Sequence, residues 1–311
     1  MEEEENQTMV AEFIFTGFSN HPTTRMMLTG FFLVAYLVTL VGNGLIILLT
    51  VYDTHLHTPM YFFLSNLSFL DICYSTTTIP QALVNFSVDR PTISYARCSC
   101  QLLTSLYLGC TECLLLAVMA YDRYVAIANP LHYTLIMSKT ERTNLALGSW
   151  TVAFLLTVVP VILMPSSVCG KNEIDHFACE LSALMKLVCS DTSKSQIVMF
   201  ITGSLSLLIP FSFILFSYMR IILTILQIRS VAGRSKAFST CGSHLTVVTV
   251  FYSTVIFKYL KPQGKSFHRQ DKIISVFYLV VTPMLNPLIY TLRNQEVIGA
   301  LRKMTGRKGD S

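Results

Sequence analysis

The sequence has little charge for its length. Of its 311 residues only 13% are Asp, Glu, Lys or Arg, whereas 52% are hydrophobic, and the mean hydropathy is +0.54. A soluble domain needs polar faces to wet its surface, and such faces are largely missing. The net charge of +5 is small and spread over connecting segments, which argues against nucleic-acid binding. The composition therefore predicts an integral membrane protein surrounded by lipids.

Motifs of enzymes and metal modules are missing as well. The sequence contains no HExxH or GxSxG motif, and its nine cysteines are too few and too scattered for a zinc module. No basic segment with a short apolar run and a cleavage site precedes Met26, so we expect the first spanning helix to direct insertion. A membrane enzyme is accordingly the weakest interpretation, and no catalytic residue is predicted.

Long apolar runs are what the sequence does contain. Seven are long enough to cross a bilayer as helices. They cover residues 26–51, 59–83, 95–127, 142–164, 196–226, 237–260 and 272–292. An odd number of crossings puts the two ends of the chain on opposite sides of the membrane. A transporter is the main alternative from another class, but the sequence has no internal repeat of the kind transporters show.

The distribution of charge predicts the orientation of the bundle. Basic residues collect in the links at 129–142 and 227–236 and in the tail, whereas the N-terminus is acidic. The positive-inside rule therefore places the C-terminus in the cytoplasm and the N-terminus outside the cell. Five basic residues near the link between the sixth and seventh spans run against this rule: Lys258, Lys261, Lys265, Arg269 and Lys272.

This topology divides the chain into three parts. Residues 1–25 form an extracellular tail, in which Asn6 begins a glycosylation sequon. Residues 26–292 form the bundle at the plasma membrane. Residues 293–311 form a cytoplasmic tail, where segment 294–304 has an apolar face opposite basic residues and predicts a short helix lying on the inner leaflet.

The third span carries a polar stripe. If residues 95–128 form one helix, Ser105 and Arg123 lie within roughly 60° of Glu112 around its axis. At about 1.5 Å of rise per residue, Ser105 and Arg123 are about 27 Å apart, close to the thickness of the hydrocarbon core. This helix can therefore link a site near one membrane surface to a site near the other.

Two carboxyl groups fall in the middle of the membrane, those of Asp71 and Glu112. Two unpaired anions there would repel each other and would be strongly desolvated. Either the pair shares a proton or a cation such as sodium lies between the two groups. No other cofactor and no metal site is predicted.

Four cysteines lie on the predicted outer, oxidising side: Cys98, Cys169, Cys179 and Cys189. Four cysteines allow three pairings, and their spacing does not choose among them.

Several longer motifs occur in a fixed order along the chain. They are LHTPMY at 56–61, MAYDRYVAI at 119–127, KAFSTC at 236–241 and PMLNPLIY at 283–290. With these motifs the sequence resembles the olfactory receptor family, in the tetrapod-type (class II) branch of the rhodopsin-like G-protein-coupled receptors. The match runs from Phe13 to Asn294, nearly the whole chain.

The resemblance implies both a fold and a function. The fold is an all-α bundle of seven transmembrane helices with a short amphipathic eighth helix. The function is that of an odorant receptor, which binds a small molecule in a transmembrane pocket and activates a stimulatory (Golf/Gs-type) heterotrimeric G protein, raising cyclic AMP. By the family's pattern, Cys98 pairs with Cys179 and Cys169 with Cys189.

The resemblance places the ligand between the third, fifth, sixth and seventh spans. The residues that face this region are small, apolar or aromatic, with a few hydroxyls and no fixed charge, which suits a small, neutral, mostly hydrophobic odorant. The candidate ligand-binding residues are Ser105, Leu106, Gly109, Cys110, Thr202, Ser206, Tyr252, Val255, Ile256 and Tyr259.

A second set of residues lies near the predicted inner surface. In the family, the contact between Asp122 and Arg123 breaks on activation, and the arginine moves inward while the sixth helix swings out. Neighbouring positions on a helix do not face each other, so we expect that contact to be flexible. The candidate switch and coupling residues are Asp122, Arg123, Tyr124, Tyr218, Lys236, His244, Asn286 and Tyr290.

Overall fold

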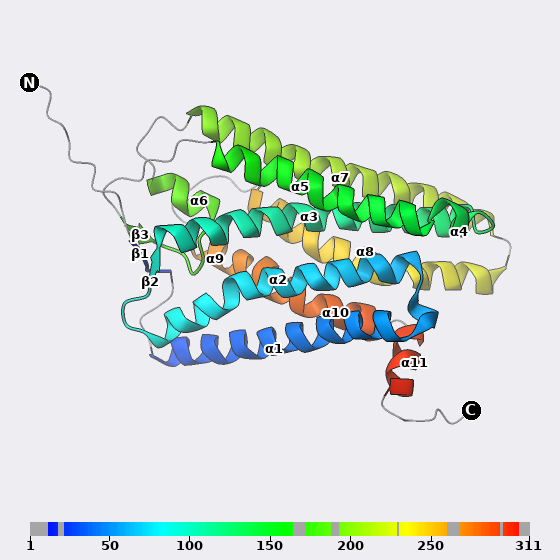
Figure 1. The fold of residues 1–311 in the computed structure, drawn as a ribbon, viewed down its shortest axis with the longest axis horizontal. Helices are drawn as coiled ribbons and strands as arrows, with labels where there is room; N and C mark the ends of the chain where they lie inside the picture. The colour runs from blue at the N-terminus through cyan, green and yellow to red at the C-terminus, as the bar shows by residue number, and fades with distance from the viewer. Residues whose placement is uncertain are drawn as a thin grey trace, which may run out of the picture.

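The computed structural model describes residues 12–17, 22–163, 172–187, 193–228, 230–259, 268–292 and 295–304. Within these ranges, seven long helical segments run along the molecule and three short strands lie at one end (Figure 1). The long segments are α1 (Pro22–Tyr52), α2 (Pro59–Ser87), α3 (Tyr95–Ala128), α5 (Lys139–Ile162), α7 (Ser193–Gln227), α8 (Val231–Tyr259) and the continuous run of α9 (His268–Val276), η4 (Phe277–Val281) and α10 (Thr282–Leu292). The short elements are β1 (Glu12–Phe15), η1 (Thr54–Leu56), β2 (Thr92–Ser94), α4 (Tyr133–Ile136), β3 (Glu173–Ile174), α6 (Leu181–Leu184), η2 (Met185–Leu187) and α11 (Gln295–Met304).

The predicted bundle of seven helices is confirmed. Among the described residues, five helical segments are long and apolar enough to cross a membrane. The other two, α2 and α8, are each 29 residues long; α2 carries hydroxyl and amide side chains among its apolar residues, and α8 carries hydroxyl and basic ones. Large apolar side chains on α1, α5 and α7 are exposed, including Val41, Leu155 and Phe200. Such a surface suits lipid tails rather than water.

The two ends of the bundle differ. The strands lie at one end, and α4 and α11 lie at the other (Figure 1). We call these the strand end and the α11 end. The predicted amphipathic helix at 294–304 corresponds to α11, in which Val297 and Ala300 are buried against the bundle.

Several boundaries differ from those predicted. Helix α1 begins at Pro22 rather than at 26, because proline suits the first turn of a helix. Helix α5 begins at Lys139, since the Ser138 hydroxyl accepts a hydrogen bond from the Glu141 amide at 3.3 Å and caps the helix. Helix α8 begins at Val231, where Ser230 accepts from the Gly233 amide at 3.1 Å. Much of the predicted link 227–236 is therefore helix.

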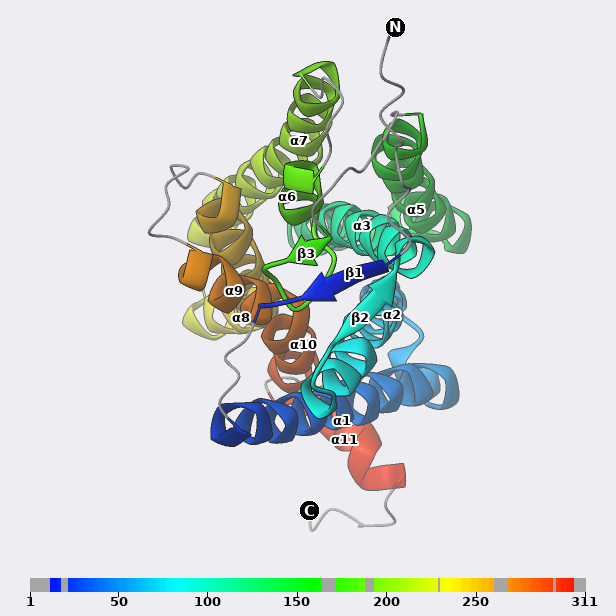
Figure 2. The same cartoon turned by 90° about the vertical axis from the view of Figure 1, so that its left-hand side faces the viewer.

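A three-stranded sheet at the strand end was not predicted. Its order is β2-β1-β3, with β1 antiparallel to β2 and parallel to β3. Seen along the bundle, the strands cross the middle of the ring of helices (Figure 2). Phe13 and Phe15 of β1 are buried in a cluster with Cys98 and Cys179. Residues 12–17, which the sequence assigned to a tail, are therefore part of the folded structure.

The last span contains a π-helical turn, η4, just before Pro283. Pro287 has no amide hydrogen to donate to the Pro283 carbonyl one turn before it, so that carbonyl needs another hydrogen-bond partner. The Pro283 carbonyl accepts a hydrogen bond from the side-chain amide of Asn43 in α1, at 3.1 Å. The Gly-Asn-Gly motif at 42–44 therefore joins α1 to α10.

Gly42 is required at this contact. A methyl group added at Gly42 would lie 2.9 Å from Cβ and Cγ of Pro287, whose ring cannot rotate away. We expect Gly42→Ala to lower the free energy of unfolding by about 1–3 kcal/mol, the usual cost of overpacking. Gly44→Ala is the matched control, since a methyl group there meets no atom within 4 Å. Melting temperatures of the two purified variants test this, and equal values would contradict it.

Candidate functional site

The mid-membrane carboxyl groups lie together in the bundle. Asp71 and Glu112 are 0% and 1% exposed, and the two groups interact electrostatically. The side-chain amide of Asn286 donates to both carboxylate oxygens of Asp71, at 3.2 and 2.9 Å. Within the described residues, Glu112 Oε1 and the hydroxyl of Ser75, one turn from Asp71, are buried without a hydrogen-bond partner. The cluster therefore has oxygen atoms available to a cation or to water.

Asp122 and Arg123 form a buried ion pair at the α11 end. The two residues are 1% and 6% exposed, and the Arg123 guanidinium contacts the Asp122 carboxylate directly. The Tyr133 hydroxyl of α4 donates to the other carboxylate oxygen at 2.8 Å. Burial and the Asp122 carboxylate both raise the pKa of Tyr133, which keeps its phenol a donor. The Tyr133 hydroxyl therefore helps to orient the Asp122 carboxylate toward Arg123, and the flexibility of this contact stays a prediction.

His244 of α8 joins three helices. Its Nε2 lies 3.1 Å from the carbonyl oxygen of Leu116 in α3, and its Nδ1 lies 2.7 Å from the hydroxyl of Tyr218 in α7. A carbonyl oxygen can only accept, so Nε2 carries a hydrogen, and in the neutral ring Nδ1 then accepts from the Tyr218 hydroxyl. These two contacts hold α8 against α3 and α7.

The remaining switch candidates surround this link. Tyr290 is buried, and its hydroxyl has no hydrogen-bond partner among the described residues. The Arg123 charge interacts electrostatically with the side chains of both Tyr290 and Tyr218. Tyr124 is half-buried against the core. The side chain of Lys236 lies outside the described part of the chain.

The candidate ligand-binding residues lie on three helices that pack together, α3, α7 and α8. Tyr252 is 1% exposed, and its ring lies 4.7 Å from that of Phe211 between centroids. Its hydroxyl has no hydrogen-bond partner within the described ranges. Cys110, separated from Cys113 by two residues, is buried as a free thiol. The half-buried members are Ser105, Leu106, Gly109, Thr202, Ser206, Val255 and Ile256, and the side chain of Tyr259 lies outside the described part.

Two of these hydroxyls already donate to their own helix. Thr202 donates to the Val198 carbonyl and Ser206 to the Gly203 carbonyl, each at 2.9 Å. Their oxygen lone pairs remain able to accept a hydrogen bond, whereas the phenol of Tyr252, which lies near the Cys113 thiol, can also donate. These three candidate residues therefore carry two acceptors and one donor in an otherwise apolar setting.

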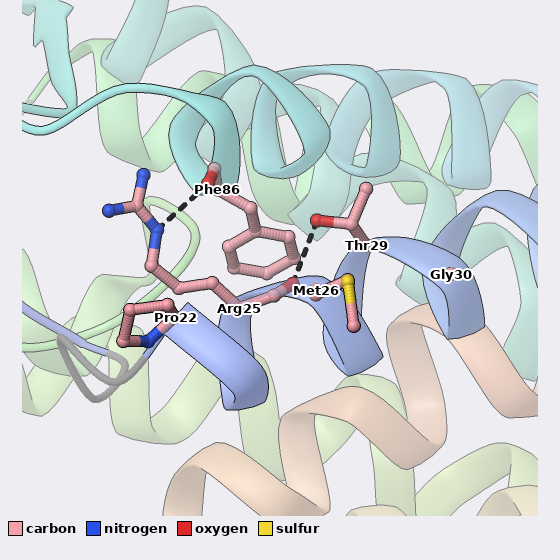
Figure 3. Close-up of a pocket in the computed structure, with 6 residues that line it drawn as sticks. All are labelled: Pro22, Arg25, Met26, Thr29, Gly30 and Phe86. Atoms are coloured by element: carbon pink, nitrogen blue, oxygen red, sulfur yellow. Dashed lines mark hydrogen bonds between the residues drawn. The ribbon is translucent and has the colours of Figure 1, made fainter.

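Two hollows lie elsewhere on the molecule. The larger, about 530 Å³, is open and is lined at the start of α1 and the end of α2 by Pro22, Arg25, Met26, Thr29, Gly30 and Phe86 (Figure 3). There the Arg25 guanidinium donates to the carbonyls of Phe86 and Val88, at 2.9 and 2.7 Å, which joins the two helices. The smaller, about 230 Å³, lies between α8 and the α9–η4 segment. None of the candidate ligand-binding residues whose side chains the structure describes lines either hollow.

The loop at residues 172–187 covers the strand end. A disulfide joins its Cys179 to Cys98 of α3, which confirms the pairing implied by the resemblance. The Cys179 amide also donates to the side-chain oxygen of Gln101 at 2.8 Å, and Gln101 in turn donates to the Thr77 carbonyl of α2 at 2.9 Å. The predicted Cys169–Cys189 bond and the Asn6 sequon lie outside the described residues.

Two lysines, one in α8 and one in α9, form ion pairs with acidic residues of the same loop. Lys258 Nζ of α8 lies 2.5 Å from Glu180 Oε2 and 2.5 Å from the Tyr278 hydroxyl, and Tyr278 donates to Glu180 Oε1. Lys272 of α9 pairs with Asp175 at 2.6 Å. Burial alone would raise the pKa of Glu180, but the Lys258 ammonium and the other hydrogen-bonding partners lower it to about 2. Two of the basic residues that run against the positive-inside rule are therefore explained by acidic partners in the loop.

Comparison with known proteins identifies the family of this chain. A family model described as olfactory receptor matches residues 32–308. The chain belongs to the olfactory receptor family. The receptor is 52% identical to human olfactory receptor 13H1 over 300 residues, which covers 96% of this chain and 97% of that protein. It is 49% identical to human olfactory receptor 13C9, with 98% of each chain covered.

Squid rhodopsin has the same fold as the receptor. Its crystal structure superimposes with a TM-score of 0.74 at 18% identity, covering 95% of this chain and 85% of that one. The receptor is therefore an odorant-sensing, G-protein-coupled, multi-pass membrane protein, and its family consists of receptors rather than enzymes.

The buried His176 in the loop at 172–187 predicts that the stability of the receptor depends on pH. Burial lowers the pKa of His176 below its ordinary value of 6.5, although the Glu180 carboxylate opposes this shift. The unfolded chain therefore accepts a proton below about pH 6.5 that the folded ring resists, so stability is full above that pH and falls as pH decreases toward the folded pKa. Glu180 stays ionised from pH 7.5 to 5.

Melting temperatures of the purified receptor over this pH range check the prediction. His176→Asn should flatten the profile, whereas His57→Asn, at an exposed position, should not. An equally steep profile in the His176 variant would assign the dependence to another group.

Proposed function

We propose that the receptor detects a small, neutral, mostly hydrophobic odorant and activates a stimulatory (Golf/Gs-type) G protein, raising cyclic AMP. The observation that carries this proposal is the link from His244 to Leu116 and Tyr218, because it joins the helix expected to move to two helices that carry candidate ligand-binding residues. Ligand contacts near the strand end can therefore alter helix packing at the α11 end.

The candidate pocket supports a neutral ligand. Its walls at Leu106, Val255 and Ile256 are apolar, and its polar groups are the hydroxyls of Thr202, Ser206 and Tyr252. Burial of an apolar ligand contributes about 25 cal/mol for each Å² removed from water, and one hydrogen bond to a hydroxyl orients it. A ligand with a single hydroxyl, aldehyde or ketone group fits this chemistry best.

The switch follows from the same contacts. Outward movement of α8 separates His244 from the Leu116 carbonyl, which leaves a buried donor and a buried acceptor without partners unless new ones form. The Tyr290 hydroxyl lies beside Arg123 and has no hydrogen-bond partner in the described part of the chain, so it offers one such new partner. In the active state Arg123 leaves Asp122 for Tyr218 and Tyr290, and the opened α11 end receives the G protein. Lys236, Tyr124 and Asn286 belong to the same moving region.

The orientation of the receptor is part of the proposal. The strand end lies outside the cell, because disulfides such as Cys98–Cys179 form and persist in oxidising compartments. The α11 end lies in the cytoplasm, in agreement with the basic residues Arg302 and Lys303 of α11. A glycan at Asn6 and a second disulfide between Cys169 and Cys189 fit the same orientation.

A sodium ion between Asp71 and Glu112 belongs to the proposed resting state. Two carboxylates with additional oxygen atoms nearby suit a hard cation, and the cation would offset the repulsion between the two anions. A shared proton would serve the same purpose. Titration with sodium distinguishes a bound sodium ion from a shared proton. At constant ionic strength, a bound ion makes the melting temperature depend on the sodium concentration, whereas a shared proton does not.

A cyclic AMP reporter screen against a chemically broad odorant panel tests the proposed function. Cells that express the receptor should respond to a subset of neutral, apolar compounds and to few ionised ones. Cells with the empty vector and surface staining of the receptor are the controls. A receptor that reaches the surface yet responds to no compound, with the olfactory α subunit co-expressed, would contradict the proposal.

A further inference from the structure

The group formed by Lys258, Glu180 and Tyr278 takes no part in the switch described above. Lys258 lies three residues beyond Val255 on α8, so the two side chains share a face of the helix. The ammonium group therefore lies about one turn nearer the strand end than the side chain of Val255. A cation in this position would ordinarily attract an anionic ligand into the pocket.

The Glu180 carboxylate prevents this because it already forms an ion pair with the Lys258 ammonium. One oxygen lies 2.5 Å from the Lys258 ammonium, and the other accepts from Tyr278. The side chains of Lys258 and Glu180 are 19% and 10% exposed, so water screens the pair only weakly. Lys272 is engaged separately by Asp175. Lys258 therefore has its counter-charge from the receptor's own loop.

We propose that Glu180 determines the charge class of the ligand: by neutralising Lys258, it makes the receptor select neutral odorants over carboxylates of the same length. This inference rests on the proposed function, since it assumes that odorants bind beside Val255. Without the Glu180 carboxylate, the partners of the Lys258 ammonium among the described residues are Tyr278, through its hydroxyl at 2.5 Å and its ring, and the Ser275 hydroxyl at 3.5 Å. A buried ammonium with two neutral partners is a binding site for a ligand carboxylate.

The test compares 1-octanol with octanoate at pH 7.4, where the acid is ionised. The variant is Glu180→Gln, which keeps the size of the side chain and a hydrogen-bonding oxygen but removes the charge. Binding is measured as the rise in melting temperature of the purified full-length receptor, and signalling as cyclic AMP in cells. We expect octanoate to act on Glu180→Gln at concentrations at least about tenfold lower than on the unaltered receptor, as one charge-assisted hydrogen bond implies.

Two further variants test whether the gain in octanoate binding depends on the Lys258 cation or follows from removing any carboxylate of the loop. Glu180→Gln combined with Lys258→Met should lose the gain, because the cation is absent. Asp175→Asn removes the loop's other paired carboxylate, which faces Lys272, and should show no gain. If Glu180→Gln fails to mature, Glu180→Ser makes the same comparison, since its shorter side chain leaves room for a carboxylate beside Lys258.

The outcomes are distinct. Unchanged octanoate binding in a folded Glu180 variant, a gain that persists without Lys258, or an equal gain in Asp175→Asn would each overturn the inference. If octanoate gains binding by the melting-temperature measurement but no compound raises cyclic AMP, the inference holds and the proposed signalling function fails. If neutral odorants raise cyclic AMP but octanoate binds the Glu180 variant no more tightly, the proposed function stands and the inference fails.

Discussion

Replacing Arg123 by alanine is expected to abolish odorant-evoked cyclic AMP while most of the receptor still reaches the cell surface. In the structure Arg123 is buried and contacts Asp122, and Tyr218 and Tyr290 lie near it. In the proposed switch, alanine removes the cation that holds the opened α11 end. Folding is affected less, because Asp122 retains the hydrogen bond from the Tyr133 hydroxyl at 2.8 Å.

The measurement is the cyclic AMP response at saturating odorant, normalised to surface staining of an N-terminal tag. A fall of more than about tenfold is expected, since loss of a charge-assisted buried interaction exceeds 1.4 kcal/mol. Arg220→Ala is the control, because it removes an exposed cation from α7. A normal response of the Arg123 variant would refute the proposed switch.

Replacing Cys98 by serine should remove most of the receptor from the cell surface. The disulfide to Cys179 joins residues 81 positions apart, and it lies in the cluster that also buries Phe13 of β1. Loss of a native disulfide typically costs about 2–5 kcal/mol, a large part of the roughly 5–15 kcal/mol that stabilises a folded protein. The loop at 172–187 would then depend on its ion pairs and on Gln101.

Cys100→Ser is a close control for this prediction. Cys100 lies two residues away on the same helix but is an exposed free thiol. Flow cytometry of unpermeabilised cells should show near-normal staining for Cys100→Ser and only a small fraction of it for Cys98→Ser. Equal staining of the two variants would show that the disulfide contributes little to folding in the cell.

Hydrophobicity predicted the number and order of the spans because bilayer thickness sets the length of each helix. It could not place their ends, since the caps at Ser138 and Ser230 act through single hydrogen bonds. The sheet at the strand end was missed for another reason. Its strands are two to four residues long and come from three distant parts of the chain, so no local period reveals them.

The candidate site was predictable only in part. Motifs located Asp122, Arg123 and His244, but the partners of His244 depend on how three helices are rotated relative to one another. Helical period likewise could not indicate that Asn43 would bind the Pro283 carbonyl. The pairing of Lys258 with Glu180 had one signal in the sequence, an excess of basic residues where the positive-inside rule predicts few.

The central claim is that an odorant bound near the strand end moves α8 away from α3 at the α11 end. Spin labels on non-natural amino acids at Leu131, just after α3, and at Ser235, near the start of α8, measure this distance directly. We predict a shift to longer distances of several ångströms when an odorant identified in the panel is added with G protein. An unchanged distance distribution in a receptor that signals normally would contradict the account.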